Sequence, residues 1–366
     1  MKVWFLRNRS SLLIIALSLF SLFAWGLVEF FPEVKPVSEF KLKQDASQRA
    51  FLCIQRIARL RQEKGLKIDS DLDPSRSGLI GLELSPVTSS SGKLASKQAS
   101  IHPDFAIWFV NQFLKVGLKK GDEIAVGISG SFPALNIALF AAADAIGIRV
   151  NTIGSVSSSQ YGANLTDLLW PDMENLLFQE GYIFQKTNVF STGGIDDQGI
   201  GIGKVGLIRI RDSIRRNGYP YLSVESFEDS LLKRIRIYEK SNVSLYVNVG
   251  GGTVSTGTSL GKKKIPKGLV YGMEEFSELP DSILKYYLEK KIPVLHVIGI
   301  ESISEESGMR YTKDVVSKPG TSNLLYTKTM DRRIAGGFFF LICFLIWKLS
   351  PWISLGETKK ENTIHL

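Results

Sequence analysis

The chain has 366 residues, of which 44% are hydrophobic, and its formal net charge is +9. This length allows one large domain or two smaller ones with an ample core. Part of the positive charge lies in two short end segments, and no basic run with interleaved aromatic residues is present, which excludes a nucleic-acid-binding protein. Cys53 and Cys343 lie in different segments, so no disulfide framework is expected, and neither has metal-ligand spacing. We expect apolar packing roles for both, no metal site and no cofactor.

The N-terminal end predicts a membrane anchor. Residues 10–28 carry no charge and are long enough to cross a bilayer as a helix. Lys2, Arg7 and Arg9 precede this span, which places the N-terminus in the cytoplasm. Bulky residues follow where a small-residue cleavage site would lie, so we expect a retained anchor in the cytoplasmic (inner) membrane and an extracytoplasmic, periplasmic main domain.

The C-terminal end predicts a second span at residues 334–355, interrupted by Lys348 and Pro351. Lys348 can extend to the interface, and Trp347 and Trp352 suit that position. The alternative is a buried or interfacial hydrophobic helix. Flanking charges leave the direction of this span open, although two spans would return the C-terminal tail to the cytoplasm. The predicted organisation is a cytoplasmic tail (1–9), a transmembrane anchor (10–31), a connector with a helix and a Ser/Gly-rich loop (32–100), an exported α/β domain (101–330), a second transmembrane helix (334–355) and a tail (356–366).

The connector contains one clear helix, at about 46–64, with apolar residues at helical spacing and Gly65 at its end. Residues 68–100 are rich in Ser, Gly and Pro, and the run SPVTSSSGKLASKQAS at 85–100 predicts a flexible surface loop. A second helix is expected over 102–118. From there apolar strands, polar turns and helices alternate. Strands are predicted at 124–128, 149–156, 186–192, 221–224, 244–249 and 293–299, and helices from Pro133 and over 170–181, 204–218, 226–240 and 278–291.

This alternation predicts an α/β fold, with a mostly parallel sheet, helices on both faces and Rossmann-like layers, flanked by the two transmembrane helices. In such sheets ligands bind beyond the carboxyl ends of the strands. The turns at 129–131, 155–164, 193–201 and 250–258 are polar and glycine-rich, so they are expected to share one rim and to form a ligand crevice.

The first of these turns joins the strand at 124–128 to a helix that begins at Pro133. We expect Ser131 to cap this helix, because proline suits the first helical turn and serine suits the position ahead of it. Free backbone amides beside two hydroxyls would then form a cradle for a carboxylate or phosphate.

The same turn, GISGS, resembles a nucleophile elbow, with Ser131 in place of the usual last glycine. A serine hydrolase also needs a base, and the exported domain contains only His102 and His296. His296 lies in an apolar strand and is interpreted as a core histidine, and His102 as a helix-start residue. Ser129 and Ser131 therefore remain the candidate catalytic residues of an alternative hypothesis.

Three other motifs give weaker indications of function. Gly201, Gly203 and Gly206 spell GxGxxG with Glu225 downstream, but a polar stretch separates them from any strand, which disfavours dinucleotide binding. The segment around Gly261 lacks P-loop spacing and predicts a basic loop. The acids near the rim are interpreted as a helix-start residue and a solvated loop pair. They are Asp172, Asp196 and Asp197.

Four segments, HPDFA, GDEIAVGISGSFPALNIA, SQYGAN and WPDME, lie in one exported domain between hydrophobic ends. With this combination the chain resembles the bacterial poly-gamma-glutamate system protein family, from the first anchor to about Thr329. The resemblance implies a membrane-associated component that works with a ligase and other membrane subunits in making, exporting or anchoring the polymer. It carries over no catalytic residues.

Poly-gamma-glutamate is a chain of carboxylates, which amides at helix starts and hydroxyls can hold. The leading hypothesis is a subunit that handles or anchors this anionic polymer in a capsule or cell-envelope system. The alternatives are a serine-dependent hydrolase or transferase acting on the polymer, and a non-catalytic scaffold of the membrane complex. The predicted ligand-binding residues are Ser129, Gly130, Ser131, Tyr161, Gly162, Asn164, Gly250, Gly251 and Gly252.

Overall fold

The computed structural model describes residues 9–257, 259–272 and 278–350, and the chain divides into two compact units. The first, here called the helical unit, consists of residues up to Val37 and from Tyr326 onward. The second, the α/β unit, is Ser38–Leu325. The predicted tails lie outside the described residues except for Arg9, as does the end of the predicted second span at 351–355.

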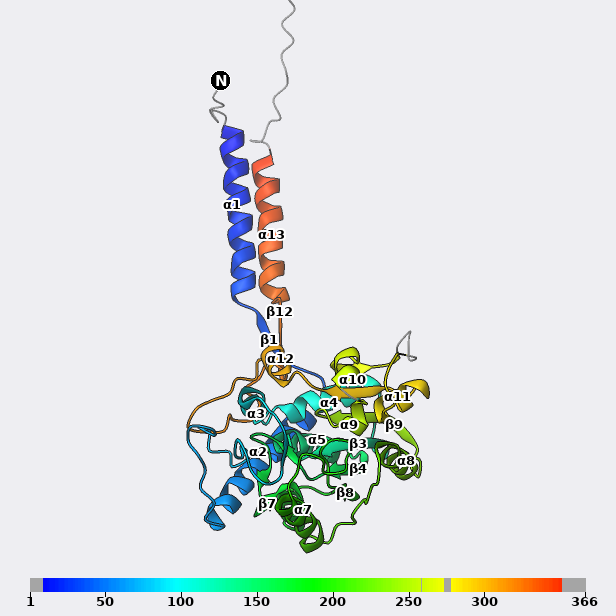
Figure 1. The fold of residues 1–366 in the computed structure, drawn as a ribbon. Coiled ribbons are helices and arrows are strands. Elements are labelled where there is room, and N and C mark those ends of the chain that lie inside the picture. The colour runs from blue at the N-terminus through cyan, green and yellow to red at the C-terminus, as the bar shows by residue number, and fades with distance from the viewer. Residues whose placement is uncertain (1–8, 258, 273–277, 351–366) are drawn as a thin grey trace, which may run out of the picture. The chain divides into compact units, whose positions relative to one another are not determined.

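The helical unit contains two long helices and a two-stranded sheet. Helix α1 (Arg9–Phe30) and helix α13 (Arg332–Leu349) lie side by side, with Phe20 and Phe338 in edge-to-face contact at 6.3 Å between ring centroids (Figure 1). Strands β1 (Glu33–Pro36) and β12 (Tyr326–Thr329) pair antiparallel. Among the described residues, one helical segment, Leu12–Phe30, has the length and composition of a membrane span. Helix α13 is also apolar, and carries Arg332, Arg333 and Lys348 at its ends.

The α/β unit is built on a six-stranded sheet in the order β10-β11-β9-β3-β4-β8. All neighbouring strands are parallel except β10, which runs antiparallel to β11 at one edge. The mixed α/β fold with a mostly parallel sheet is therefore confirmed. The sheet strands are β3 (Glu123–Ser129), β4 (Arg149–Ser155), β8 (Val189–Ser191), β9 (Val243–Val249), β10 (Gly268–Val270) and β11 (Val294–Val297).

Two buried clusters occupy opposite faces of this sheet, because side chains alternate along a strand. On β3, Val126 belongs to the larger cluster and Ala125 to the smaller, and on β9 Val247 and Tyr246 divide in the same way. The larger cluster includes residues of α2, α4, α5 and α6, and the smaller includes residues of α8 and α11. The helices of the unit are α2 (Phe40–Glu63), α3 (Leu94–Ala99), α4 (Phe105–Val116), α5 (Pro133–Ile146), α6 (Trp170–Gln179), α7 (Lys204–Arg216), α8 (Phe227–Tyr238), α9 (Thr253–Thr256), α10 (Ser259–Lys264), α11 (Ile283–Glu289) and α12 (Ile300–Glu306).

The strand order reverses between β3 and β9. The chain runs from β3 outward to β4 and β8, then returns to β9, continues to the edge strand β10 and comes back to β11 between them. The four strands β8, β4, β3 and β9 follow the order of doubly wound dinucleotide-binding sheets, in which the crevice lies at the reversal point. The turn after β3 and the turn after β9 therefore meet at the centre of the sheet edge.

Two segments differ from the sequence-based prediction. Residues 85–100, predicted as a flexible loop, contain β2 (Thr88–Ser90) and α3, and β2 pairs parallel with β5 (Ser158–Ser159). The strand predicted at 221–224 is reduced to one bridge between Tyr221 and Phe190. A two-stranded ribbon of β6 (Asn164–Leu165) and β7 (Leu168–Leu169) precedes α6.

Candidate functional site

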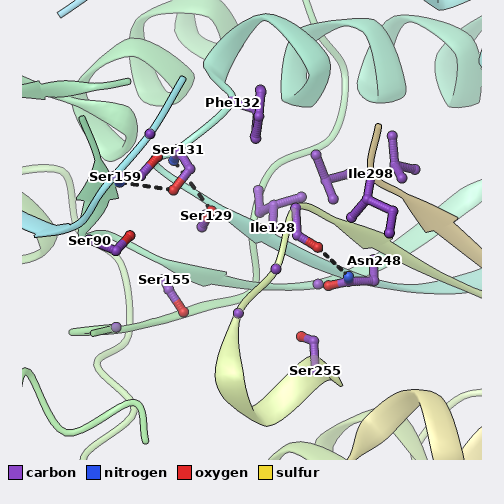
Figure 2. A pocket seen from close by; sticks show the side chains of 18 of the residues that line it. Ser90, Ile128, Ser129, Ser131, Phe132, Ser155, Ser159, Asn248, Ser255 and Ile298 are labelled. Carbon is purple, nitrogen blue, oxygen red and sulfur yellow. Dashed lines mark hydrogen bonds between the residues drawn. The ribbon is translucent and has the colours of Figure 1, made fainter. Parts of the chain in front are cut away.

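A cavity of about 820 Å³ opens at the carboxyl ends of the parallel strands (Figure 2). Its wall combines the ends of β3, β4, β9 and β11 with the loop after β8 and with residues 89–97. All four polar turns singled out in the sequence contribute residues to this wall. Most of the polar groups are serine hydroxyls and glycine backbone. Figure 2 labels ten lining residues: Ser90, Ile128, Ser129, Ser131, Phe132, Ser155, Ser159, Asn248, Ser255 and Ile298.

The turn between β3 and α5 is held by its own polar groups. The Ser131 amide donates to Oγ of Ser129 at 3.3 Å, and the Asn136 side-chain amide donates to the Ser129 carbonyl at 2.9 Å. A Cβ at Gly130 would lie 2.6 Å from the carbonyl oxygen of Val156, so only glycine lets the turn pass so close to the segment after β4. Both serine side chains line the cavity.

Ser131 does not cap α5, contrary to the prediction. The residue at the cap position is Phe132, whose side chain makes no capping hydrogen bond. The Ser131 hydroxyl instead accepts the backbone amide of Ser159 at 3.0 Å, as the dashed line in Figure 2 shows. The close approach of β5 captures this hydroxyl, and this tertiary contact replaces the local one.

Lys97 of α3 is buried, with 3% of its surface exposed, and lies in the cavity wall. Its Nζ donates to the Ser131 carbonyl and lies 2.8 Å from Oγ of Ser159. It also lies 3.6 Å from the ring centroid of Phe132. Lys97 thus joins α3, the turn after β3, and β5 at one point of the wall.

A buried ion pair lies beside the carboxyl ends of β4 and β8, in the cavity wall. Nη2 of Arg234, from α8, contacts the Asp197 carboxylate at 2.7 Å, and both side chains are almost completely buried. Arg234 also donates to Ser191 at 2.8 Å and to Ser155 at 3.2 Å. Burial by itself lowers the pKa of Arg234, but the negative charge of Asp197 offsets it, and the pKa lies above its ordinary value. The group is a charged, hydrogen-bonded support for the cavity wall.

The glycine loop after β9 forms another part of the wall. Gly250 adopts φ of +94°, which glycine tolerates, and its amide donates to the carbonyl of Val297 at 3.1 Å. A Cβ at Gly252 would meet only Oγ of Ser255, at 3.9 Å, so open space lies in front of this residue. The Asn248 side-chain amide donates to the Gly250 carbonyl at 2.6 Å and fixes the start of the loop.

The structure brings five of the predicted ligand-binding residues into one cavity wall: Ser129, Ser131, Gly250, Gly251 and Gly252. The other four are outside the set of described residues that line it. Gly130 shapes the turn after β3. A Cβ at Gly162 would lie 2.7 Å from the carbonyl oxygen of Gly130. Asn164 is buried and bonds both backbone groups of Leu82, while Tyr161 bonds Leu82 and Gly81 through its backbone. These contacts hold residues 81–82 against the segment after β5.

Neither candidate histidine lies among the described residues that line the cavity. His296 is fully buried in β11 and its Nδ1 lies 3.1 Å from the Asn248 side-chain amide, as expected of a core histidine. His102 is buried before α4, where Nδ1 accepts the amide of Asp104 at 3.2 Å, and burial lowers its pKa. The Asp104 carboxylate accepts the amides of Gly320 at 2.7 Å and of Ser322 at 2.9 Å. Asp104 therefore anchors the C-terminal segment of the α/β unit.

The acidic residues divide into two kinds. Asp172 is a helix-start acid, as predicted, since it accepts the amide of Leu169 at 2.8 Å and pairs with Arg216. Asp197 is not solvated, which corrects the prediction of a solvated loop pair: it adopts φ of +65° and is buried on Arg234. Within the part of the chain that the structure describes, no group of three or more His, Cys, Asp or Glu residues forms a metal site.

The GxGxxG segment serves packing and helix initiation. Gly203 precedes α7, and a Cβ at Gly206 would lie 1.9 Å from the carbonyl oxygen of Pro86. Glu225 lies before α8, where its amide donates to Asp229 at 3.0 Å. The position of the dinucleotide fingerprint in a doubly wound sheet is the turn after the first strand, which here is the turn after β3.

Lys97 and Arg234 were not predicted from the sequence. Lys97 lies in a serine-rich segment that was interpreted as a loop. The short run LASKQA within this segment is compatible with a helix and could have indicated α3. Arg234 lies in an amphipathic basic helix, where a buried arginine has the same sequence appearance as an exposed one.

No protein family, curated protein or solved structure matches this chain.

Proposed function

We propose that this protein is a membrane-anchored component that binds an anionic, amide-linked polymer of the poly-gamma-glutamate type in the cavity of the α/β unit. The observation that carries the proposal is the convergence of Ser129, Ser131 and the glycine loop at 250–252 on one cavity at the reversal point of the sheet. Hydroxyls and backbone amides are the groups that hold carboxylates without a metal. An amide-linked chain offers carboxylates for these donors and peptide-like groups for the glycine carbonyls.

The charges of the wall point to recognition mainly by hydrogen bonds. Lys93 and Lys97 line the cavity, but Glu301 and Glu305 line it as well, and Arg234 is paired with Asp197. Since the opposite charges are nearly balanced, binding is expected to weaken only modestly with salt. A purely electrostatic trap for polyanions would instead lose most of its affinity.

The proposal includes the membrane arrangement. Helix α1 is the anchor, with the N-terminus in the cytoplasm and the α/β unit outside it, and α13 is a second membrane helix that pairs with α1 through contacts such as Phe20 with Phe338. Other membrane subunits of the same system are the expected partners. A two-helix anchor holds a polymer-binding unit close to the exit of a synthesis or export complex.

Filling the cavity tests this proposal. Gly252→Leu places a side chain in the open space in front of the glycine loop, at a residue whose φ of −60° suits any amino acid. Gly203→Leu is the matched control, because Gly203 also precedes a helix with φ of −71° and has nothing within 4 Å of a Cβ. Poly-gamma-glutamate oligomers of defined length are titrated onto the full-length protein in detergent at low and high salt.

We expect saturable binding to the unsubstituted protein and to Gly203→Leu, and at least a tenfold loss for Gly252→Leu. Equal binding by all three proteins, or no saturable binding to any, would reject the cavity as the polymer site. If the protein is a scaffold only, Gly252→Leu leaves polymer production in cells unchanged while loss of α1 or α13 abolishes it.

The serine-dependent alternative centred on Ser129 or Ser131 has less support. Both hydroxyls are engaged by backbone amides, at 3.3 Å for Ser129 and 3.0 Å for Ser131. Neither has a histidine base among the described lining residues. Their arrangement is better suited to donating hydrogen bonds to a ligand.

A further inference from the structure

We infer that Ser159 and Lys97 form a serine–lysine pair for acyl transfer in the cavity wall. Oγ of Ser159 lies 2.8 Å from Nζ of Lys97, which is the distance at which a general base accepts a hydroxyl proton. Both residues line the cavity, and both are shielded from solvent, with 8% of Ser159 and 3% of Lys97 exposed. Lysine replaces histidine as the base in known variants of serine catalysis.

The fold holds this pair rigidly. Ser159 lies in β5, where it pairs with Ser90 of β2, and its amide donates to Ser131 (Figure 2). Lys97 lies on α3, six residues long, which follows the same β2 segment. A Cβ at Gly92 would lie 2.6 Å from the carbonyl oxygen of Gln160 and 3.1 Å from Oγ of Ser159, so glycine lets the chain pass close to this hydroxyl. Together, β5 and α3 place the Lys97 amine beside the Ser159 hydroxyl.

The surroundings of Lys97 suit a base. A lysine accepts a proton through its neutral amine. The Ser131 carbonyl and the Phe132 ring contact Nζ, and both stabilise the ammonium ion that forms when the proton is taken. The hydroxyls of Ser129 and Ser131 line the same wall and supply donors for an oxyanion.

The reaction proceeds in two balanced steps. In the first, Oγ of Ser159 bonds to a carbonyl carbon of the substrate while its proton passes to the Lys97 amine. The tetrahedral oxyanion then collapses, the carbon–nitrogen bond breaks, and the Lys97 ammonium returns the proton to the departing amine. Ser159 now carries the acyl group as an ester.

In the second step, water or an acceptor amine gives a proton to Lys97 and bonds to the ester carbon. The bond from this carbon to Oγ breaks, and Ser159 regains the proton from Lys97. Water yields a carboxylic acid and an acceptor amine yields a new amide. No oxidant or reductant is needed.

The inference rests on the proposed function only for its first substrate, an amide-linked anionic chain. A substrate-independent experiment therefore comes first. The full-length protein in detergent is treated with a fluorophosphonate and with a β-lactone, and the labelled serine is located by peptide mapping. We expect labelling of Ser159, abolished by Ser159→Ala, and slowed on the order of 100-fold by Lys97→Met. Controls are Ser223→Ala and Lys119→Met, at exposed positions outside the cavity wall.

Lys97→Met also removes a buried amine, so the pH profile adds a readout that misfolding does not mimic. The labelling rate of the unsubstituted protein should rise with pH through one titration that Lys97→Met lacks. Ser159→Ala removes one oxygen atom, and its thermal unfolding checks that the fold is kept. Labelling at any other serine, no labelling by either reagent, or the same pH profile in Lys97→Met overturns the pair.

Incubation with poly-gamma-glutamate of defined length separates this inference from the proposed function. Shortened chains, or chains joined to an added amine, with both products absent in Ser159→Ala, support both. Labelling of Ser159 without polymer binding leaves the pair standing and rejects the polymer. Polymer binding without labelling of Ser159 rejects the pair and leaves a binding protein.

Discussion

Glu174 provides the sharpest test of how this fold treats a buried charge. The residue lies on α6, is fully buried, and accepts the hydroxyl and the amide of Thr187 at 2.7 and 3.2 Å. Burial raises the pKa of this carboxyl to about 7, although the hydrogen bonds from Thr187 oppose the shift. The change to make is Glu174→Gln, which keeps the shape and an oxygen for Thr187 but cannot ionise.

The magnitude follows from the shift. The pKa rises from 4.5 to about 7, and each unit is worth about 1.4 kcal/mol, so Glu174 contributes a pH-dependent free energy of unfolding of about 3 kcal/mol. Because the folded-state pKa is raised, this stability is fully present below pH 4.5. It is lost as the pH rises toward 7, where the unfolded chain has released a proton that the folded chain still holds.

The assay is urea unfolding of the full-length protein in detergent at several pH values between 4.5 and 7.5. We expect the unsubstituted protein to lose about 3 kcal/mol relative to Glu174→Gln across this range. Glu289→Gln, at an exposed glutamate that ends α11, is the control and should follow the unsubstituted protein. A difference between the unsubstituted protein and Glu174→Gln that stays constant with pH would refute the reasoning.

Two further predictions concern the ion pair and the anchor. Arg234→Met leaves the Asp197 carboxylate buried without its arginine partner, which should lower the free energy of unfolding in urea by about 3–5 kcal/mol. Adding Asp197→Asn should recover a large part of this lost stability. Equal stability of the single and double variants would contradict this. Leu19→Arg places a charge within α1, which should cost membrane insertion about 3 kcal/mol. This variant should move protein out of the alkali-resistant membrane fraction, whereas the control Leu232→Arg on α8 should not. Unchanged fractionation of Leu19→Arg would show that an intact α1 is not needed for membrane attachment.

Sequence patterns predicted the layered fold because they act locally. In β3 and β9, apolar side chains follow one another with small or aromatic residues between them, which is typical of strands covered on both faces. Polar turns at the strand ends placed the crevice correctly, since parallel strands all end at the same edge. The antiparallel edge strand β10 has only three residues, too short a run to show a period.

The candidate site was predicted less completely. Ser129, Ser131 and the glycine loop were found because helix starts and glycine turns have a local signature. Lys97 was missed, because a lysine in a serine-rich segment has the appearance of a solvated residue until the elements that bury it are in place. Asp197 was misinterpreted for the same reason, since its partner Arg234 is 37 residues away.

The sequence by itself therefore determined the apolar ends, the alternation of strands and helices, and the edge of the sheet at which the cavity opens. Only the tertiary structure decided which polar groups meet at that edge. The Ser131 hydroxyl turns from its own helix to the amide of Ser159, and Lys97 reaches the Ser159 hydroxyl across 62 residues of chain. Hydrophobic periodicity is a property of neighbouring residues, whereas contacts between buried polar groups depend on which distant segments the fold packs together.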